Sequence, residues 1–367
     1  EFEFEFLGLI VFQDPPKENI IETIKTFNNA GITVKMITGD YAETALAIAD
    51  QVKLSHNGEV LTGKDVLHLS ATALQQKVKA VNIYARMFPE AKLKVIEALK
   101  DEGEIVAMTG DGVNDGPALK AAHIGIAMGL RGSEVAKNAA SLILNDDDLS
   151  HMTDAVALGR KIYDNLKKAI QYIVSIHIPI ILIVTLPLLL AWKYVNIFSP
   201  VHVIFLELIM GPTCSIIYEN EPMEPGTMLR PPRKPGNTFL SFRQLTTSII
   251  QGLIITTGCL GIGFYFIQQG ANESVVRTII FITLLFSNIF LTLVNRSFRY
   301  SIFKTLGYKN NLVPLIIAIT LILIAAQLYL PFVRNLFGLQ PLSLQHVGIC
   351  IAVGMVSTCW LEIWKFF

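Results

Sequence analysis

Two carboxylates and one carboxamide stand close together in the segment MTGDGVNDGPALK, residues 108–120. A short apolar strand, residues 104–108, leads into this glycine-rich turn, and a helix follows it. Ligands of open α/β sheets bind at the carboxyl ends of strands, where Asp111 and Asp115 would lie. Carboxylates suit a hard cation such as Mg²⁺, and Asn114 can donate to a phosphate that the glycines allow to come close. The pattern indicates a phosphate and magnesium site, although such residue pairs also form ordinary surface turns.

A second strand, residues 32–37, ends in Thr38-Gly39-Asp40 just before a helix over residues 42–52. A hydroxyl and free backbone N–H groups at the start of a helix favour an anion, because the helix dipole is positive there. Asp is also a preferred N-cap residue, so an ordinary helix cap is the alternative. The pattern alone leaves both interpretations open.

A third strand, residues 81–85, is followed by Arg86 and, after Pro89, by a helix that carries Lys92. By residue type alone, Lys92 is expected to be a solvated lysine on a helix face. A phosphate-binding role for these cations therefore depends on more than their type.

Strands and helices alternate through residues 1–148, which favours an α/β domain with a mostly parallel sheet covered by helices on both faces. Further strands are expected over residues 2–12, 123–128 and 141–144. The chain begins at Glu1, inside the first expected strand, and we therefore expect a fragment of a longer protein.

The charges of the 367 residues are balanced, with 30 Lys and Arg against 30 Asp and Glu, so the composition predicts no nucleic-acid partner. The acidic residues are unevenly placed, because no Asp follows residue 168. The first part is therefore expected to be soluble and the second to lie in a lipid bilayer. The four cysteines fall in apolar stretches without metal-ligand spacing, which predicts small core residues.

An amphipathic stalk segment, residues 149–168, leads without a helix breaker into an apolar membrane domain, residues 169–367. One continuous helix over the stalk and the first span would be about 60 Å long at 1.5 Å per residue. Six membrane spans are expected, at about residues 169–191, 197–218, 245–267, 275–295, 312–333 and 346–366. Lys and Arg gather in the even-numbered loops, which predicts six crossings with both ends of the chain cytoplasmic.

Glu207 falls in the middle of its span, where a charge is costly enough to indicate a function, and we expect it to be a buried ion or proton site. Gly211-Pro212 should unwind the helix just beyond it and free carbonyl oxygens for an ion. His177 lies at a matching depth in the preceding span, and Asn288 in a later one could add a polar ligand. Hydrogen bonding between helices is the alternative for both His177 and Asn288.

Three segments together resemble the P-type ion-pumping ATPases. TGDGVNDGPALK resembles the hinge motif of that family, with Gly116 in place of the usual Ala. KMITGDYAETALAIA and YARMFPEAKLKVIEAL resemble two further segments of its phosphorylation domain. The resemblance implies an α/β haloacid-dehalogenase-like (Rossmannoid) partial phosphorylation domain followed by an all-α six-helix transmembrane domain.

The resemblance also implies roles for individual residues. Thr38, Gly39 and Asp40 would contact phosphate and nucleotide, and Arg86 would help to hold ATP. Lys92 would neutralise the transferred phosphoryl group, the electrostatic stabilisation that dominates phosphoryl transfer. In the whole protein Asp111 and Asp115 would bind Mg²⁺, with Asp115 and Asn114 holding the turn.

The resemblance covers the second part of such a pump only. The chain contains no DKTGT, the segment with the Asp that accepts phosphate, and no TGE of the actuator domain. The nucleotide-binding domain and four membrane helices would lie in a missing amino-terminal half, so the chain alone is expected to be inactive. Six helices after the hinge motif resemble the ten-helix pumps, and MLRPPRKP resembles the type II branch, which contains the calcium and sodium/potassium pumps.

Alignment with the calcium pump places His177, Ile180, Glu207, Met210 and Gly211 at its ion-site positions, so two of its carboxylates are absent. Because calcium prefers six to eight oxygen ligands, a proton or a monovalent cation is at least as well suited to this pocket.

The expected function is that of the carboxyl-terminal portion of an ATP-driven cation pump in a plasma or inner membrane. The alternative is a non-catalytic, membrane-bound nucleotide-binding remnant or partner of such a pump. A soluble-type phosphatase with a membrane anchor fits poorly, because one span would serve as an anchor.

Overall fold

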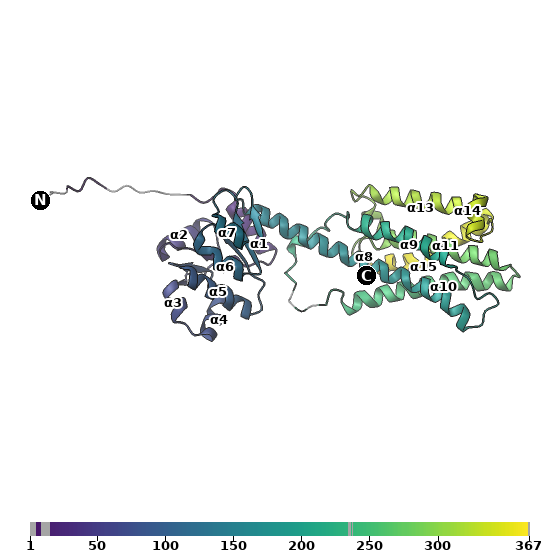
Figure 1. Ribbon diagram of the computed structural model, residues 1–367, viewed down its shortest axis with the longest axis horizontal. Helices are drawn as coiled ribbons and strands as arrows, with labels where there is room; N and C mark the ends of the chain where they lie inside the picture. The colour runs from purple at the N-terminus through teal and green to yellow at the C-terminus, as the bar shows by residue number, and fades with distance from the viewer. Residues whose placement is uncertain (1–4, 9–14, 234–235, 237, 366–367) are drawn as a thin grey trace. The chain divides into compact units, whose positions relative to one another are not determined.

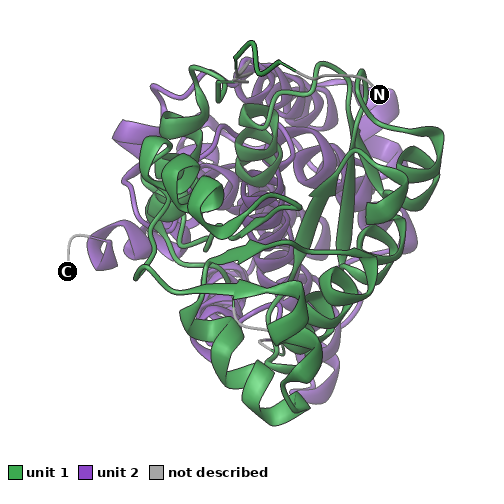
Figure 2. Cartoon of the chain, turned by 90° about the vertical axis from the view of Figure 1, so that its left-hand side faces the viewer, with its two compact units in different colours: residues 1–158, 225–237 green, residues 159–224, 238–367 purple. Residues whose placement is uncertain are grey.

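The computed structural model describes residues 5–8, 15–233, 236 and 238–365. Contacts within the chain divide it into two compact units (Figure 2). The α/β unit comprises residues 1–158 and 225–237, and the helical unit comprises residues 159–224 and 238–367. The sequence pattern places boundaries at residues 148 and 168, on either side of the stalk segment. Contacts divide the chain at residue 158 instead, within a helix, and the α/β unit includes a second segment.

The α/β unit contains two three-stranded sheets in which neighbouring strands are parallel. The first has the order β1-β3-β2 and the second the order β4-β5-β6. The strands are β1 (Met36–Ile37), β2 (Val60–Thr62), β3 (Ile83–Ala85), β4 (Ala107–Gly110), β5 (Ile124–Met128) and β6 (Leu142–Leu144). The sequence pattern predicts one sheet, but among the described residues no ladder joins the two. Apolar side chains join them instead, because Ile37 and Leu99 pack against the cores of both.

Short helices surround these strands in the α/β unit (Figure 1). They are α1 (Ile20–Asn29), α2 (Ala42–Gln51), α3 (Gly63–His68), α4 (Ala71–Ala80), α5 (Pro89–Asp101), η1 (Val113–Asp115), α6 (Gly116–Ala121), α7 (Glu134–Ala139) and η3 (Thr227–Leu229). Helix α1 buries Ile24 and Phe27, which recur at helical spacing, and α5 begins with Pro89, whose fixed φ suits the first turn of a helix. The strand expected over residues 2–12 lies mostly outside the described residues, and residues 5–8 form no regular element.

Pro231 and Pro232, from the second segment of the α/β unit, pack at the end of α1. Gly31 has a φ of +72° there, a conformation that favours glycine. A Cβ atom on Gly31 would lie 2.8 Å from Pro232 Cδ and 3.1 Å from Pro231 Cα. The absence of a side chain therefore lets the two prolines pack directly against the backbone.

Helix α8 (Ser150–Leu189) runs through 40 residues and passes from the α/β unit into the helical unit. Pro179 and Pro187 lie inside it without ending it. At 1.5 Å per residue the helix is about 60 Å long. This confirms the prediction that the stalk and the first apolar span form one helix.

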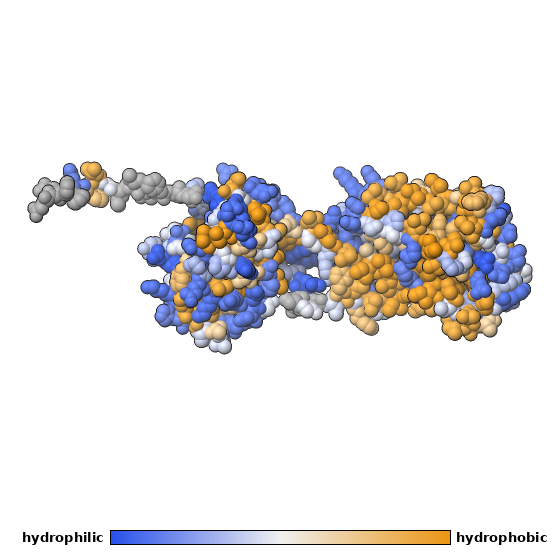
Figure 3. Space-filling view, viewed as in Figure 1, coloured by the Kyte–Doolittle hydropathy of each residue, from blue (hydrophilic) through white to orange (hydrophobic). Residues whose placement is uncertain are grey.

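The helical unit contains, besides α8, the elements α9 (Pro200–Pro212), η2 (Thr213–Tyr218), α10 (Phe242–Gln268), α11 (Glu273–Val294), α12 (Ile302–Thr305), α13 (Leu312–Tyr329), α14 (Pro331–Leu336) and α15 (Leu344–Trp364). In the described part of the chain, six helical segments are long and apolar enough to cross a membrane, as predicted. Apolar residues cover much of the visible surface of this unit (Figure 3). Helix α11 is the most deeply buried of the six. The four cysteines were expected to be small core residues, and of these Cys259 and Cys350 are buried whereas Cys214 and Cys359 are half-buried.

Candidate functional site

The first part of the candidate phosphate site lies where β1 and β3 end. These strands are parallel, and Ile37 pairs with Tyr84, so both leave the sheet at the same edge. The Arg86 N–H donates to the Asp40 carbonyl at 2.8 Å, and the Met87 N–H donates to the Thr38 carbonyl at 2.9 Å. The register of the two strands therefore brings the Thr38-Gly39-Asp40 turn beside Arg86.

The side chains of this turn contact each other and do not cap the following helix. The Thr38 hydroxyl donates to Asp40 Oδ2 at 2.9 Å, and the Asp40 N–H donates to Thr38 Oγ1 at 3.1 Å. Tyr41 is the N-cap residue of α2, and it makes no side-chain capping bond. The helix-cap interpretation of Asp40 is therefore wrong. Gly39 is exposed, and a Cβ atom added to it would meet no atom within 4 Å, so this turn is open to a ligand.

Arg86 has a backbone conformation that only a minority of non-glycine residues adopt, with φ at +49°. Its exposed guanidinium lies 4.5 Å from the centre of the Tyr41 ring. Such a cation–π contact holds the planar side chain at the open end of the sheet. An Arg in this position can donate to phosphate oxygens in two directions.

The second part of the site is a buried ion pair at the end of β4. Lys92 Nζ, from the first turns of α5, lies 2.6 Å from Asp115 Oδ1, and the two side chains are 13% and 9% exposed. The Asp111 and Gly112 N–H groups donate to Asp115 Oδ2 at 3.3 and 3.2 Å. The Asp115 carboxylate therefore closes the glycine turn and fixes the Lys92 ammonium.

Asp111 and Asn114 belong to the same turn as this ion pair, but both are exposed. The Asp111 carbonyl accepts from the Ser133 N–H at 2.7 Å, which holds the loop before α7 against the turn. The Asp111 carboxylate itself has no polar partner among the described residues. The structure thus brings Lys92, Asp111 and Asp115 together, and α5 connects them to Arg86, which precedes that helix by three residues.

Of the two predicted magnesium ligands, Asp111 and Asp115, one has a carboxylate that is free to bind the ion. Mg²⁺ is usually held by one or two carboxylates, with phosphate and water oxygens completing an octahedron. The exposed carboxylate of Asp111 can serve in this way. The carboxylate of Asp115 already accepts from Lys92 and from two backbone N–H groups, so its geometry suits a positioning role better than metal binding.

The candidate ion site lies in the helical unit, where His177 on α8 meets Glu207 on α9. His177 Nε2 lies 3.2 Å from Glu207 Oε1, and the other ring nitrogen, Nδ1, lies 2.8 Å from the Ile173 carbonyl. The two side chains are 40% and 53% exposed. The expectation that Glu207 is buried is therefore wrong for the described chain, because α9 turns Leu206 and Met210 inward and Glu207 outward.

Asn288 lies apart from this pair, within the helix bundle. It is 1% exposed, and its Oδ1 accepts a hydrogen bond from the Tyr172 hydroxyl. Its Nδ2 has no partner among the described residues. Asn288 also lines a small cavity between α9, η2, α11 and α13, together with Thr213, Thr292 and Thr320. Within the part of the chain that the structure describes, no polar contact connects Asn288 with His177 or Glu207.

The helix does not unwind at Gly211-Pro212 as predicted. Helix α9 continues to Pro212, and residues Thr213–Tyr218 form a π-helix. Proline removes one backbone donor, and the wider π turn adapts to that loss without ending the helix. Such π segments occur often at functional sites, and this one lines the cavity beside Asn288.

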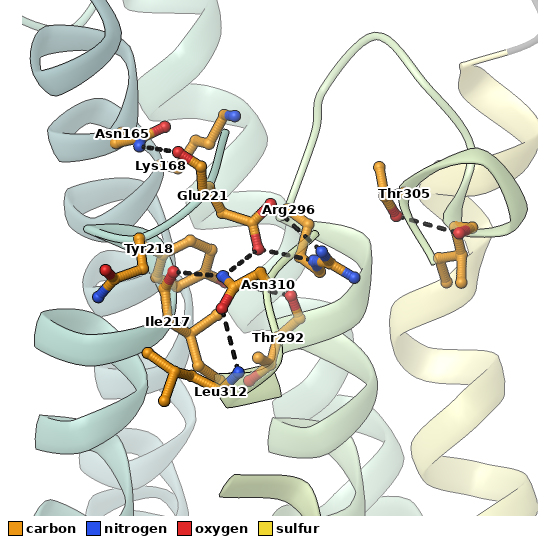
Figure 4. Close-up of polar contacts among 12 residues, drawn as sticks. Asn165, Lys168, Ile217, Tyr218, Glu221, Thr292, Arg296, Thr305, Asn310 and Leu312 are labelled. Atoms are coloured by element: carbon orange, nitrogen blue, oxygen red, sulfur yellow. Dashed lines mark hydrogen bonds and ion pairs between the residues drawn. The ribbon is translucent and has the colours of Figure 1, made fainter. Parts of the chain in front are cut away.

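A buried polar cluster that the sequence analysis does not predict joins several elements of the helical unit (Figure 4). Glu221 and Arg296 are 0% and 2% exposed and form a two-point ion pair at 2.8 and 3.3 Å. Asn310 donates to Glu221 Oε1 at 3.0 Å, and Asn165 on α8 donates to the Glu221 carbonyl at 2.7 Å. The available signal was the position of these polar residues directly beside apolar spans.

The fold and the site define a class: an α/β head of the haloacid-dehalogenase type joined by one helix to a bundle of membrane-spanning length. Comparison with known families agrees over both units. Residues 1–123 match the family "haloacid dehalogenase-like hydrolase", and residues 195–367 match the family "Cation transporting ATPase, C-terminus".

Relatives in bacteria and in the mouse extend this agreement over the whole chain. It is 34% identical to "Calcium-transporting ATPase 1" of Lactococcus lactis, over 100% of this chain and 41% of the relative. It is 32% identical to "Probable cation-transporting ATPase F" of Mycobacterium bovis, over 96% of this chain and 39% of the relative. It is 33% identical to "Calcium-transporting ATPase type 2C member 2" of Mus musculus, over 99% of this chain and 39% of the relative. The chain belongs to the cation-transporting ATPases, as a multi-pass membrane protein that spans about 40% of the length of these relatives.

Proposed function

We propose that the chain is the carboxyl-terminal portion of an ATP-driven cation pump that works through an aspartyl-phosphate intermediate, with the acceptor Asp outside these 367 residues. The observation that carries this proposal is the buried Lys92–Asp115 ion pair beside the exposed carboxylate of Asp111. The names of the relatives, which describe calcium-transporting and cation-transporting ATPases, support it.

Lys92 would stabilise the phosphoryl group during its transfer. The Asp115 carboxylate holds the Lys92 ammonium in one position, so little reorganisation is needed when negative charge develops nearby. Removal of one such preorganised donor from an active site typically slows the reaction by about 10²- to 10³-fold. Asp111 would hold the magnesium ion, which, when bound, neutralises charge on the phosphate oxygens.

The turn Thr38-Gly39-Asp40 and Arg86 would bind the nucleotide. The open backbone at Gly39 can approach a phosphate, and the Arg86 guanidinium, stacked on Tyr41, can pair with one. ATP binding through these residues is consistent with their place at the carboxyl edge of a parallel sheet.

Helix α8 would connect catalysis with ion transport. It begins in the α/β unit and carries His177 in the helical unit without a break. A continuous helix transmits rotation or tilt along its whole length, whereas a flexible linker does not. The transported cation would bind at His177 and Glu207, with the Asn288 cavity as a second polar position in the bundle.

The head and both chain ends would face the cytoplasm, in a plasma or inner membrane. The basic residues Arg230 and Arg233 stand between two spans, and Arg243 stands in the first turn of the following span. Arg296, Arg299 and Lys304 stand between two later spans. An excess of Lys and Arg marks cytoplasmic loops.

Phosphorylation of the full-length protein tests this function. Membranes that contain it would be incubated with Mg²⁺ and radiolabelled ATP, quenched in acid and assayed for protein-bound phosphate. We expect labelling in the parent, and an initial rate lowered about 100-fold or more in Lys92→Ala, by loss of a preorganised cation. Lys120→Ala, which changes an exposed lysine of the neighbouring helix, is the matched control and should label as the parent does. Labelling of Lys92→Ala at the parental rate would contradict the proposal, and absence of label in the parent would favour a non-catalytic remnant.

A further inference from the structure

The contacts of His177 determine where its protons are. The Ile173 carbonyl can only accept a hydrogen bond, so Nδ1 of His177, 2.8 Å away, must carry a proton. Nε2 then either carries a second proton or presents a lone pair to Glu207. The protonation of Nε2 is thus coupled to that of the Glu207 carboxylate.

The 3.2 Å contact between His177 Nε2 and Glu207 Oε1 requires one further proton. With that proton on Nε2, an imidazolium donates to a carboxylate, and with it on the carboxyl group, a neutral acid donates to a neutral imidazole. Without it, a lone pair would face a carboxylate oxygen, and the two acceptors would repel each other. In this geometry a single shared proton would join the two side chains in one hydrogen bond.

Apolar side chains neighbour the pair on both helices. Ile181 lies four residues after His177 on α8, and Ile204 and Leu208 lie three residues before and one residue after Glu207 on α9. All three are between 57% and 68% exposed. In either arrangement of the extra proton the pair has no net charge, whereas its loss leaves a net negative charge. A net charge on an apolar face of a membrane helix is costly.

The same segment offers little to a calcium ion. Between residues 169 and 218, Glu207 is the only acidic residue of the sequence, and Met210 and Gly211 supply no side-chain oxygen. Calcium takes six to eight oxygen ligands. A further titratable group near Glu207 is the half-buried thiol of Cys214 on η2, which is a poor ligand for a hard cation.

We propose that the ion carried by this pump is the proton, bound between His177 and Glu207. The proposal rests on the proposed function and gives its substrate class. One proton enters from water on one side of the membrane and joins the carboxylate and the neutral imidazole in a single hydrogen bond. When the two side chains separate, that proton leaves to water on the other side, and both groups return to their starting states.

Proton movement by the full-length protein tests this directly. Liposomes containing the protein and an entrapped pH-sensitive dye would receive ATP and Mg²⁺ in choline nitrate with a calcium chelator, free of sodium and potassium. We expect an ATP-dependent change of luminal pH. The amide of Glu207→Gln can donate to Nε2 but cannot take up and release a proton as a carboxylate does. His177→Ala removes the partner, so each variant should lower the rate to less than a tenth of the parent.

Matched controls separate the site from general effects. Glu273→Gln makes the same chemical change at the start of α11, where Glu273 pairs with Arg277, and it should move protons at the parental rate. Glu207→Gln should still accept phosphate from ATP, which shows that the variant is folded. A parental rate of pH change in both Glu207→Gln and His177→Ala would overturn the proposal.

The experiment also distinguishes failure of this proposal from failure of the proposed function. Phosphorylation from ATP that requires calcium, sodium or potassium and produces no change of luminal pH would refute the proton assignment and leave the pump intact. Absence of phosphorylation with every cation would refute the pump itself.

Discussion

At the scale of single residues, Gly110 shows how closely the phosphate site is built. A Cβ atom at this position would lie 2.6 Å from Asp115 Cβ and 2.8 Å from Asp115 Cγ. Asp115 cannot retreat, because Lys92 and two backbone N–H groups hold its carboxylate. Only a residue without a side chain lets β4 end this close to the ion pair.

Gly110→Ala should therefore destabilise the α/β unit and slow phosphorylation together. Overpacking of this kind typically costs about 1–3 kcal/mol, and the displaced carboxylate would also misplace Lys92. Thermal unfolding and phosphorylation from ATP would be measured on the full-length protein. Gly39→Ala is the control for stability, since a Cβ there meets no atom within 4 Å, and equal unfolding temperatures for the two variants would contradict the packing argument.

Asp148 controls the start of α8 through its charge. Its carboxylate accepts from the Ser150 N–H at 2.8 Å and from the Asn19 amide at 2.9 and 2.8 Å. These hydrogen bonds, the backbone one first, lower the pKa of Asp148 to about 2 from an ordinary value of 3.8. Because the folded state favours the charged form, the stabilisation is complete above pH 3.8 and is lost as the pH falls towards 2.

Asp148→Asn should consequently lower the unfolding temperature near neutral pH, and the difference from the parent should narrow as the pH falls below about 4. Unfolding would be followed calorimetrically between pH 2 and pH 7. Asp101→Asn, at an exposed position, is the control and should show no such pH-dependent difference. If the difference in unfolding temperature between Asp148→Asn and the parent stays constant over the whole pH range, the stabilisation by Asp148 does not come from its charge.

At the scale of elements, the Glu221–Arg296 pair fastens the segment after η2 to the segment after α11 (Figure 4). Asn310, just before α13, and Asn165 on α8 complete the cluster. Removing one member of a buried ion pair leaves the other charged and unpaired, which typically costs about 3–5 kcal/mol. Replacing both by apolar residues costs far less.

Arg296→Ala should therefore unfold in detergent at a markedly lower denaturant concentration than the parent. The double variant Glu221→Met with Arg296→Met should recover most of the lost stability, because no unpaired charge is left. Arg299→Ala, an exposed arginine three residues along, serves as the control. A double variant as unstable as Arg296→Ala alone would show that the arginine acts through packing and not through its charge.

The sequence predicts elements and motifs better than contacts between them. The glycine turn with Asp111 and Asp115 was recognisable because its residues are consecutive. The continuity of α8 was recognisable because no breaker stands where the stalk segment meets the first apolar span. Glu221 and Arg296 stand 75 residues apart, so only the packing of helices brings them together. The outward direction of the Glu207 side chain could not be predicted either. The sequence gives the position of a residue along its helix, but it does not tell which face of that helix packs against other helices.

At the scale of the whole molecule, the charges of the segments between spans support the proposed orientation in the membrane. The segment 225–237, which connects two membrane helices, belongs to the α/β unit. It contains Arg230 and Arg233, and Arg243 follows in the first turn of α10. The connection between α10 and α11, around Gln269, is short and lacks basic residues. The two connections are therefore expected on opposite sides of the membrane.

Cysteine accessibility tests that orientation on the full-length protein. Thr238→Cys should react with a membrane-impermeant thiol reagent in inverted vesicles and not in intact cells, whereas Gln269→Cys should react in intact cells. Both positions are exposed, and the parent, whose four cysteines are buried or half-buried, gives the background. The two positions lie on either side of α10. They can be labelled from opposite sides only if α10 crosses the membrane, so the experiment tests that crossing. Labelling of both variants from the same side would place α10 in the plane of the membrane, and the six-span arrangement would then be wrong.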